Sequence, residues 1–483
     1  MATALISLFL LLFGGSSLVD VERAYLIPWV LATGVVVAIP CVYLYFRGEF
    51  KFTNPLAFAA LTYFFPMFFL GGWSLTFGLS NYYFLNYVAD PEYNFPLTFL
   101  YIMVGFAGLS VGYFIPNGKS IGNYLSAKLP NWEFTPTEIV LACVFCLAAG
   151  FCLNIVALEI GQIGYQTGDV VFGDTGSMAS YLATVLPASS FLLWIAFFKF
   201  EKWNFLHIVV IAAQIVTAVF MLVIQGGKSS LLYFAVLAIG AFVLVKRKVG
   251  LKHWSIFAGA LLVCLIAGTF YGTKFRELKG NADRVSFLEY SSIAFESMEQ
   301  FGEADPFKEL SASGALLADR LEIVSSFAVV VSNYESMSSY EAAYGLDNSI
   351  WTYTWTAFIP RILWKDKPIV ADNYSYNELY FDHGGFGLSL TAMGDLLRNF
   401  GPIGVPIGMI VLGFGIRIFY SMLVEGVPFS MWKATVYFVV ITKVSYDGFY
   451  GEILPTVIRV SAVIFVQFLL LRAVAQFLRS VKG

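Results

Sequence analysis

Charge is scarce in this chain. Only 13% of its 483 residues are Asp, Glu, Lys or Arg, whereas 58% are hydrophobic, and this balance excludes a soluble globular core. The formal net charge of −3 gives no reason to expect nucleic acid as a partner. The composition places the chain among polytopic membrane proteins, in which the positions of the few charges carry most of the information.

Cysteine is also scarce. The five cysteines lie in apolar runs, which excludes a disulfide framework in an external loop: Cys41, Cys143, Cys146, Cys152 and Cys264. Cys143 and Cys146 form a CxxC spacing, but no His or acidic neighbour completes a metal set. The largest polar segment holds no Asp-x-Asp pair. We therefore expect neither a bound metal nor a cofactor.

A secretory signal is missing as well. Residues 3–19 are apolar but lack the Lys or Arg that opens such a signal, and no cleavage pattern precedes a soluble domain. We therefore expect this stretch to be retained as a first helix.

Long apolar stretches, by contrast, are abundant. A helix needs about 18 to 23 residues to cross the hydrocarbon layer of a bilayer. Stretches of roughly this length predict an all-α polytopic membrane protein with about twelve transmembrane helices, at 2–19, 24–46, 55–79, 95–114, 139–160, 181–200, 205–224, 229–245, 254–271, 402–420, 431–446 and 453–471.

The cations of the short loops are distributed unevenly between the two sides of the membrane. One side has only Arg23 and Lys228, and the other has Arg47, Lys51, Lys119, Lys128, Lys199, Lys202, Lys246, Arg247, Lys248, Lys252, Arg417, Lys433, Arg472, Arg479 and Lys482. The positive-inside rule then predicts that both termini are cytoplasmic. The chain divides into 1–271 with membrane helices 1–9, a large external loop at 272–401, and 402–483 with helices 10–12 and the cytoplasmic C-terminus.

The external loop is rich in aromatic and aliphatic residues and should fold, mostly as helices. The residues Trp351, Tyr353 and Trp355 suit either an interfacial aromatic belt or stacking faces for a sugar. Arg320 flanks the apolar face of an amphipathic helix predicted within 306–333, and a permanent charge there is expected to contact an anion. The apolar spacing that predicts this helix runs through Leu317, Leu321, Val324, Ala328 and Val331.

Two motifs in this loop combine charge with Gly or Pro turns. PRILWKDKP (360–368) carries Arg361, Lys365 and Lys367 around an Asp, which suits either lipid phosphates or a substrate anion. FDHGGFG (381–387) places Asp382 beside His383 in a turn where backbone could approach a ligand. A lone His is more often a surface residue than a base, so both interpretations stay open.

Charged residues inside apolar spans are costly and usually functional. Lys443, with Asp447 four residues on, and Arg459, with Glu452 before it, lie near the predicted external ends of their spans. Lys228 lies between glycines and serines in QGGKSS. Each of these cations suits either a snorkelling end residue or a phosphate-binding group.

These motifs carry a family likeness. PRILWKDKP, followed by GDLLRNFGPIGV (394–405) at the start of a span, resembles the bacterial oligosaccharide repeat-unit polymerases of the Wzy type. In that family an Ile-Pro-Arg, Trp and Lys-Pro run precedes a Gly-acidic, Asn-Phe-Gly and Gly run. QGGKSSLL resembles a small-small-Arg-small motif of the same group and of the related O-antigen ligases, although Lys228 stands where Arg is usual.

The resemblance implies a GT-C-like membrane glycosyltransferase without a metal. It would move a growing glycan from undecaprenyl diphosphate onto the next lipid-linked unit, at the outer face of the bacterial cytoplasmic membrane. The implied partners are lipid-linked oligosaccharide, membrane lipids and other polysaccharide assembly proteins, such as a flippase and a chain-length regulator.

Such a reaction needs cations to stabilise the diphosphate leaving group, and a group that orients or deprotonates the acceptor hydroxyl. For the diphosphate contacts we expect Arg361, Arg320, Lys228, Arg276, Arg398 and Lys365. As catalytic residues we expect Arg361, Asp382 and His383, with Asp372 and Glu378 as further candidates for the base.

Other function classes stay open at this point. An O-antigen ligase differs only in its acceptor, and a carrier or flippase for a lipid-linked sugar or an anionic substrate would line a pathway with the same cations. A scaffold subunit of an envelope complex is a third possibility. A carrier predicts charge at the midplane, on helices broken by Gly or Pro in both halves. The charges here gather at predicted outer ends and in one loop, which favours the polymerase.

Overall fold

The structure is a computed structural model. It describes residues 23–79, 83–132, 134–161, 163–164, 181–199, 204–225, 230–246, 249–280, 286–303, 318, 320–359, 363–364, 367–368, 373–382, 390–425 and 428–482. Every regular element within these ranges is a helix. The protein is therefore an all-α protein, as its long apolar stretches predict.

The helices of the first half of the chain are η1 (Ala24–Leu26), α2 (Ile27–Phe46), α3 (Pro55–Ala59), η2 (Ala60–Leu70, a π-helix), α4 (Gly71–Thr76), η3 (Tyr83–Tyr87), α5 (Pro91–Phe114), α6 (Pro116–Lys128), α7 (Pro136–Glu159), α9 (Val185–Lys199), α10 (Phe205–Gln225) and α11 (Ser230–Lys246). Those of the second half are α12 (Leu251–Lys279), α13 (Phe287–Glu303), α15 (Val324–Glu341), α16 (Ser349–Thr356), α17 (Asn373–Phe381), α18 (Ala392–Leu423), α19 (Met431–Ile441) and α20 (Tyr450–Lys482).

The described part of the chain has eight helices that are long and apolar enough to cross a membrane, taking Pro55–Thr76 as one. Three predicted spans are shorter apolar helices, namely α9, α11 and α19, and the predicted span 2–19 lies outside the described residues. The long helices turn apolar side chains outward. On α18, for example, Ile403, Ile407 and Val411 are 71%, 56% and 60% exposed at four-residue spacing. The chain is a multi-pass membrane protein whose outer faces suit lipid.

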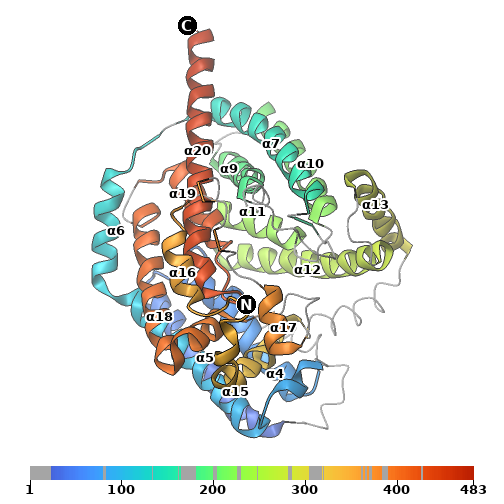
Figure 1. The fold of residues 1–483 in the computed structure, drawn as a ribbon. Coiled ribbons are helices and arrows are strands. Elements are labelled where there is room, and N and C mark those ends of the chain that lie inside the picture. Colours follow the sequence, from blue (N-terminus) through green and yellow to red (C-terminus); the bar gives the residue numbers. More distant parts are fainter. Residues whose placement is uncertain are drawn as a thin grey trace.

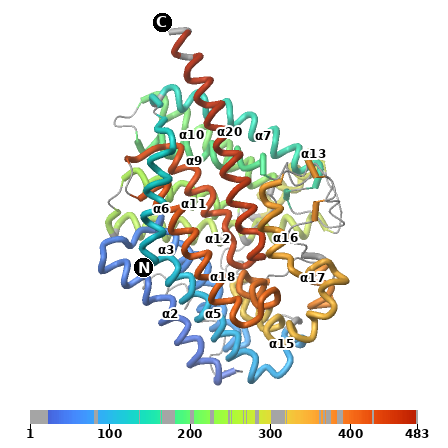
Figure 2. The backbone as a smooth tube through the Cα atoms, turned by 60° about the vertical axis from the view of Figure 1, so that its left-hand side comes forward, coloured from blue at the N-terminus to red at the C-terminus, as the bar shows by residue number. Residues whose placement is uncertain are grey.

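Helix α18 packs along α5 and α6 (Figures 1 and 2), and glycines bring the helices close together at several points. A Cβ on Gly112 would lie 2.0 Å from the carbonyl oxygen of Ile410, and one on Gly413 would lie 2.1 Å from that of Leu109. Farther along the seam, a Cβ on Gly122 would lie 2.6 Å from the Ser421 side chain. Glycines at these positions allow the close approach that packs helices in lipid.

Helix α18 bends at Gly401, where φ is 70° and ψ is −168°. This backbone conformation favours glycine, and Pro402 follows it. The part of α18 before the bend belongs to the predicted external segment 272–401, and the part after it is a predicted span. At the other boundary, α12 continues without a break to Lys279.

Two helices differ from their predicted ranges. Within 306–333, the described residues 322–323 are not helical, and α15 begins at Val324 because the Glu322 carboxylate accepts hydrogen bonds from the Ser325 amide and hydroxyl. Helix α19 ends at Ile441 instead of 446. The carbonyls of Tyr446 and Asp447 then accept hydrogen bonds from the first amides of α18.

The two ends of the molecule differ in what they carry. Helix α20 extends beyond its neighbours at the C-terminal end, whereas α15 and α17 gather at the opposite end (Figures 1 and 2). The N-terminal part of α18 and the break between α19 and α20 (residues 442–449) lie near α15, α16 and α17, and this part of α18 carries the buried Asp395 and Arg398.

Candidate functional site

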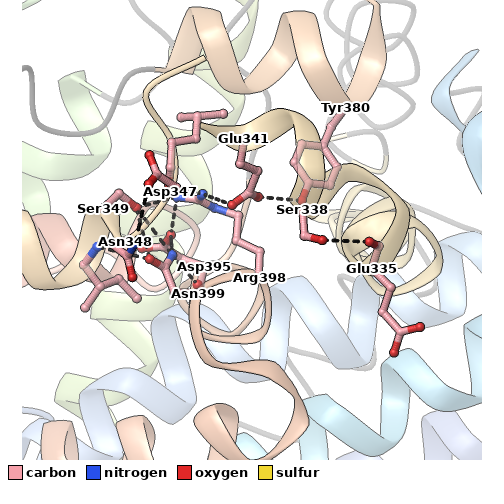
Figure 3. Close-up of polar contacts among 12 residues, drawn as sticks. Glu335, Ser338, Glu341, Asp347, Asn348, Ser349, Tyr380, Asp395, Arg398 and Asn399 are labelled. Atoms are coloured by element: carbon pink, nitrogen blue, oxygen red, sulfur yellow. Dashed lines mark hydrogen bonds and ion pairs between the residues drawn. The ribbon is translucent and has the colours of Figure 1, made fainter. Parts of the chain in front are cut away.

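Two groups of polar side chains border the start of α20. The first contacts the Gly451 amide, and the second lies on the residues around it in the chain. We call the first the Arg398 network; it consists of Arg398, Asp395, Asn399, Glu341, Ser349 and Tyr380 (Figure 3). We call the second the break cluster; it consists of four charged residues at the break between α19 and α20 or on the first turns of α20, namely Lys443, Asp447, Glu452 and Arg459.

The guanidinium of Arg398 is buried, and both of its Nη atoms contact protein oxygens, whereas its Nε has no hydrogen-bond partner among the described residues. Its Nη1 lies 3.2 Å from Oε2 of Glu341 and donates to the Leu346 carbonyl at 2.7 Å. Its Nη2 donates to Oγ of Ser349 at 2.6 Å and to Oδ1 of Asp395 at 2.8 Å. The side chains of Arg398 and Asp395 are 0% exposed, so these charge-assisted bonds operate away from water.

The spacing of GDLLRNFG explains how the members of the network on α18 come together. Asp395, Arg398 and Asn399 lie three and four residues apart and therefore share one face of α18. The amide of Asn399 donates to the Asp395 backbone carbonyl at 2.9 Å and to Oδ1 at 3.1 Å. The other carboxylate oxygen of Asp395 accepts from the Gly451 amide at 3.1 Å, which fixes the start of α20 to α18.

Glu341 brings the loop helices to the same point. Its Oε1 accepts from the Tyr380 hydroxyl at 2.8 Å, and its Oε2 pairs with Arg398. Burial raises the pKa of the Glu341 carboxyl even though the Arg398 guanidinium opposes this shift, and burial also raises the pKa of the Tyr380 hydroxyl. The network thus joins α15, α16, α17, α18 and α20, and two carboxylates share one guanidinium.

The break cluster is more open. Lys443 is exposed, and its ammonium lies 5.2 Å from the centroid of the Tyr233 ring. This ammonium forms no ion pair with a carboxylate of the described residues, and it donates no hydrogen bond to any of them. On α20, Nη1 of Arg459 donates to the Tyr181 hydroxyl at 2.9 Å, and Glu452 lies within electrostatic range of Arg459 and Asp447.

The backbone of the break is held from α18 and from its own side chains. The Asp447 carbonyl accepts from the Thr391 amide at 3.1 Å, and the Asp447 carboxylate accepts from the Ser445 hydroxyl. The Tyr446 carbonyl accepts from the Ala392 amide at 3.0 Å. Burial raises the pKa of the Asp447 carboxyl. The helix that carries GDLLRNFG therefore starts directly on the break between α19 and α20.

The structure distributes the predicted site residues widely. Outside the described residues lie Arg361, Lys365, His383, Asp372 and Lys228. Exposed side chains belong to Arg320, Asp382 and Glu378. Arg276 is half-buried on α12, and Arg398 alone of the predicted set enters the network. A diphosphate contact by Arg398 stays a prediction, and it would have to displace Ser349, Asp395 or Glu341.

Several members of the network were not predicted from the sequence. Asp395 stands in the Gly-acidic position of the motif, and its three-residue spacing to Arg398 was a signal that could have identified it. Glu341, Ser349 and Tyr380 had no such signal, because their partners are distant in the chain.

The described residues contain no candidate metal-binding site. No group of three or more His, Cys, Asp or Glu side chains among the described residues could hold a metal ion. Cys143 and Cys146 are buried as free thiols. Metal independence stays a prediction, because several carboxylates lie outside the described ranges.

No protein-family model matches the chain, and neither a curated protein nor a solved structure matches it.

Proposed function

We propose that the protein polymerises lipid-linked oligosaccharide repeat units in the bacterial cytoplasmic membrane. The twelve-span, GT-C-like arrangement, the cytoplasmic termini and a site at the outer face are parts of this proposal. The observation that carries it is local: the helix bearing GDLLRNFG begins on the α19–α20 break, where its first amides donate to the Tyr446 and Asp447 carbonyls. Resemblance of the motifs to Wzy-type polymerases supplies the substrate class.

The reaction transfers the growing glycan between lipid carriers. The acceptor hydroxyl attacks the anomeric carbon, and undecaprenyl diphosphate leaves with the electron pair of the broken C–O bond. The proton of the hydroxyl passes to a base, for which Asp382 and His383 are the candidates. Arg and Lys side chains stabilise the charge that develops on the diphosphate.

The cations for this role come from two sources. From the motifs and the predicted external loop we propose Arg361, Arg320, Lys228, Arg276 and Lys365. The geometry of the break adds Lys443 and Arg459, which lie near the start of α20. Arg398 is better suited to hold the loop helices against α18, since protein oxygens already contact both of its Nη atoms.

A lipid-linked sugar carrier is the second candidate, and one observation favours it. The last residues of the predicted span 431–446 are non-helical and include Lys443, and Asp447 follows just beyond that span. Broken helices with charge are typical of transporter binding sites. An O-antigen ligase remains a variant of the first proposal with another acceptor.

Purified protein with lipid-linked repeat units and no other enzyme tests the proposal. Longer glycans on one lipid carrier would establish polymerisation. Intact substrate with no longer product would reject it, and movement of that substrate across proteoliposomes would favour the carrier.

The residue test uses Arg361→Lys, which keeps the charge but loses the paired donors of the fork. We expect glycan elongation to fall on the order of tenfold to thousandfold, equivalent to about 1.4 to 4 kcal/mol. Arg284→Lys, in the same predicted loop but outside the motifs, is the matched control. Wild-type turnover by Arg361→Lys and Arg361→Ala at equal protein levels would remove Arg361 from the site.

A further inference from the structure

A cavity of about 360 Å³ lies at the opposite end of α18 from the Arg398 network. It is lined by residues of the turn from Gly48 to Asn54, of the C-terminal end of α11, of the C-terminal end of α18, and of the segment 428–434 at the start of α19. The distribution of Lys and Arg assigns these helix ends to the cytoplasmic side. The cavity is therefore separate from the polymerase site proposed above.

The carboxylates of this cavity are already paired. Glu425 lies 2.9 Å from Nη2 of Arg417 and 3.2 Å from the ammonium of Lys119. Glu49 lies 3.2 Å from Nη2 of Arg47. Lys51 lines the cavity with an exposed side chain, and no described residue forms an ion pair with it. Cations around the cavity thus neutralise its carboxylates, and the charge of Lys51 is left without a carboxylate among the described residues.

The first turn of α19 adds hydrogen-bond donors. Ser430 is the N-cap of α19 but makes no capping hydrogen bond, and its hydroxyl is buried without a partner among the described residues. Ser430 and Ala434 both line the cavity. The uncapped amides and the positive end of the helix dipole favour a negative group at this position.

The remaining wall is apolar. Val243 and Leu244 of α11 face the cavity together with Tyr420, Leu423 and Phe429. A ligand that satisfies both parts of the lining has a phosphate at one end and hydrocarbon at the other. The volume is at the small end of ligand sites and suits a headgroup more than a glycan chain.

We propose that this cavity binds the phosphate headgroup of an anionic phospholipid from the cytoplasmic leaflet. The phosphate contacts Lys51 and the first turn of α19, and the glycerol and first methylenes contact Val243, Leu244 and Phe429. Inorganic phosphate shares the polar contacts but gains nothing from the apolar wall. This inference does not depend on the polymerase proposal.

Native mass spectrometry of the full-length detergent-solubilised protein, titrated with phosphatidylglycerol, tests the site. We expect one tightly retained lipid, with affinity lowered about tenfold in Lys51→Glu. Lys252→Glu, an exposed cation at the start of α12 outside the cavity, should retain the lipid like the wild type. Equal retention by Lys51→Glu would overturn the proposal.

A second variant separates the lipid from a soluble anion. Phe429→Ala removes part of the apolar wall and leaves Lys51 in place. It should weaken the retention of phosphatidylglycerol. The lipid assignment is wrong if millimolar inorganic phosphate displaces the lipid completely and the Phe429→Ala variant retains phosphatidylglycerol like the wild type. The cavity is then a site for soluble phosphate.

Discussion

The Arg398 network and the break cluster both border the start of α20, but they use charge in opposite ways. In the network, two carboxylates, a hydroxyl and a carbonyl contact the two Nη atoms of one guanidinium whose side chain is buried. In the cluster, Lys443 is exposed against a tyrosine ring. A buried charge in ion pairs stabilises a fold, whereas an exposed charge without an ion pair is available to a ligand. The motif residue Arg398 therefore has the geometry of a scaffold, and Lys443 that of a binding group.

The strongest test of this contrast is Arg398→Met. Removing one partner of a buried ion pair leaves Asp395 and Glu341 uncompensated, and we expect a loss of about 3 to 5 kcal/mol in the free energy of unfolding. Thermal unfolding in detergent measures it, with exposed Arg472→Met as the matched control. Unfolding at the wild-type temperature would show that the network does not hold the loop helices.

The second test is Lys443→Met, which should affect function and spare stability. We expect the free energy of unfolding to change by less than about 0.5 kcal/mol, because the side chain is exposed. Glycan elongation should fall on the order of tenfold to hundredfold if the ammonium stabilises the leaving diphosphate. Lys252→Met serves as control. A folded, fully active Lys443→Met protein would take Lys443 out of the site.

The third test concerns Glu322, a buried carboxylate without the ion pair that Glu341 has. Glu322 is 2% exposed, and burial raises its pKa from 4.5 to about 7, although hydrogen bonds from Ser325 and the charge of Arg23 oppose the shift. The folded state therefore favours the protonated form. Stability is highest below the unfolded pKa and is lost as pH rises through about 7.

For wild type we expect a loss of roughly 1 to 2 kcal/mol between pH 5 and 7.5 from this group. Glu322→Gln should flatten the profile of unfolding temperature against pH, whereas Glu378→Gln, on an exposed part of α17, should not. An unchanged slope in Glu322→Gln would mean that Glu322 is not the group that titrates.

Hydropathy and length predicted the eight long apolar helices of the described residues, because the apolar length of a span is a local property of the sequence. The end of α19 was not predictable in this way. It ends at Ile441, and the non-helical residues that follow contact α18: the Tyr446 and Asp447 carbonyls accept from the amides of Ala392 and Thr391, which lie more than fifty residues earlier in the chain. The start of α15 likewise depends on the side chain of Glu322.

The candidate site follows the same division. Lys443 and Arg459 were identified from the sequence because a charge within an apolar run is conspicuous. Asp395 and Arg398 lie within one motif on one helix. Glu341 and Tyr380 reach them only through the packing of α15 and α17 against α18, which no local pattern records.

The contact between α5 and α18 restricts how the protein can move. At Gly112 and Gly413 the backbones touch directly, and a relative rotation of either helix would drive atoms into a neighbouring carbonyl. The two helices therefore behave as one rigid body during any conformational change. Any rocking motion of the protein has to displace other helices against this fixed frame. Helix α18 lies on α5 on both sides of its bend, since Gly105 of α5 faces Met393 before the bend and Val405 after it.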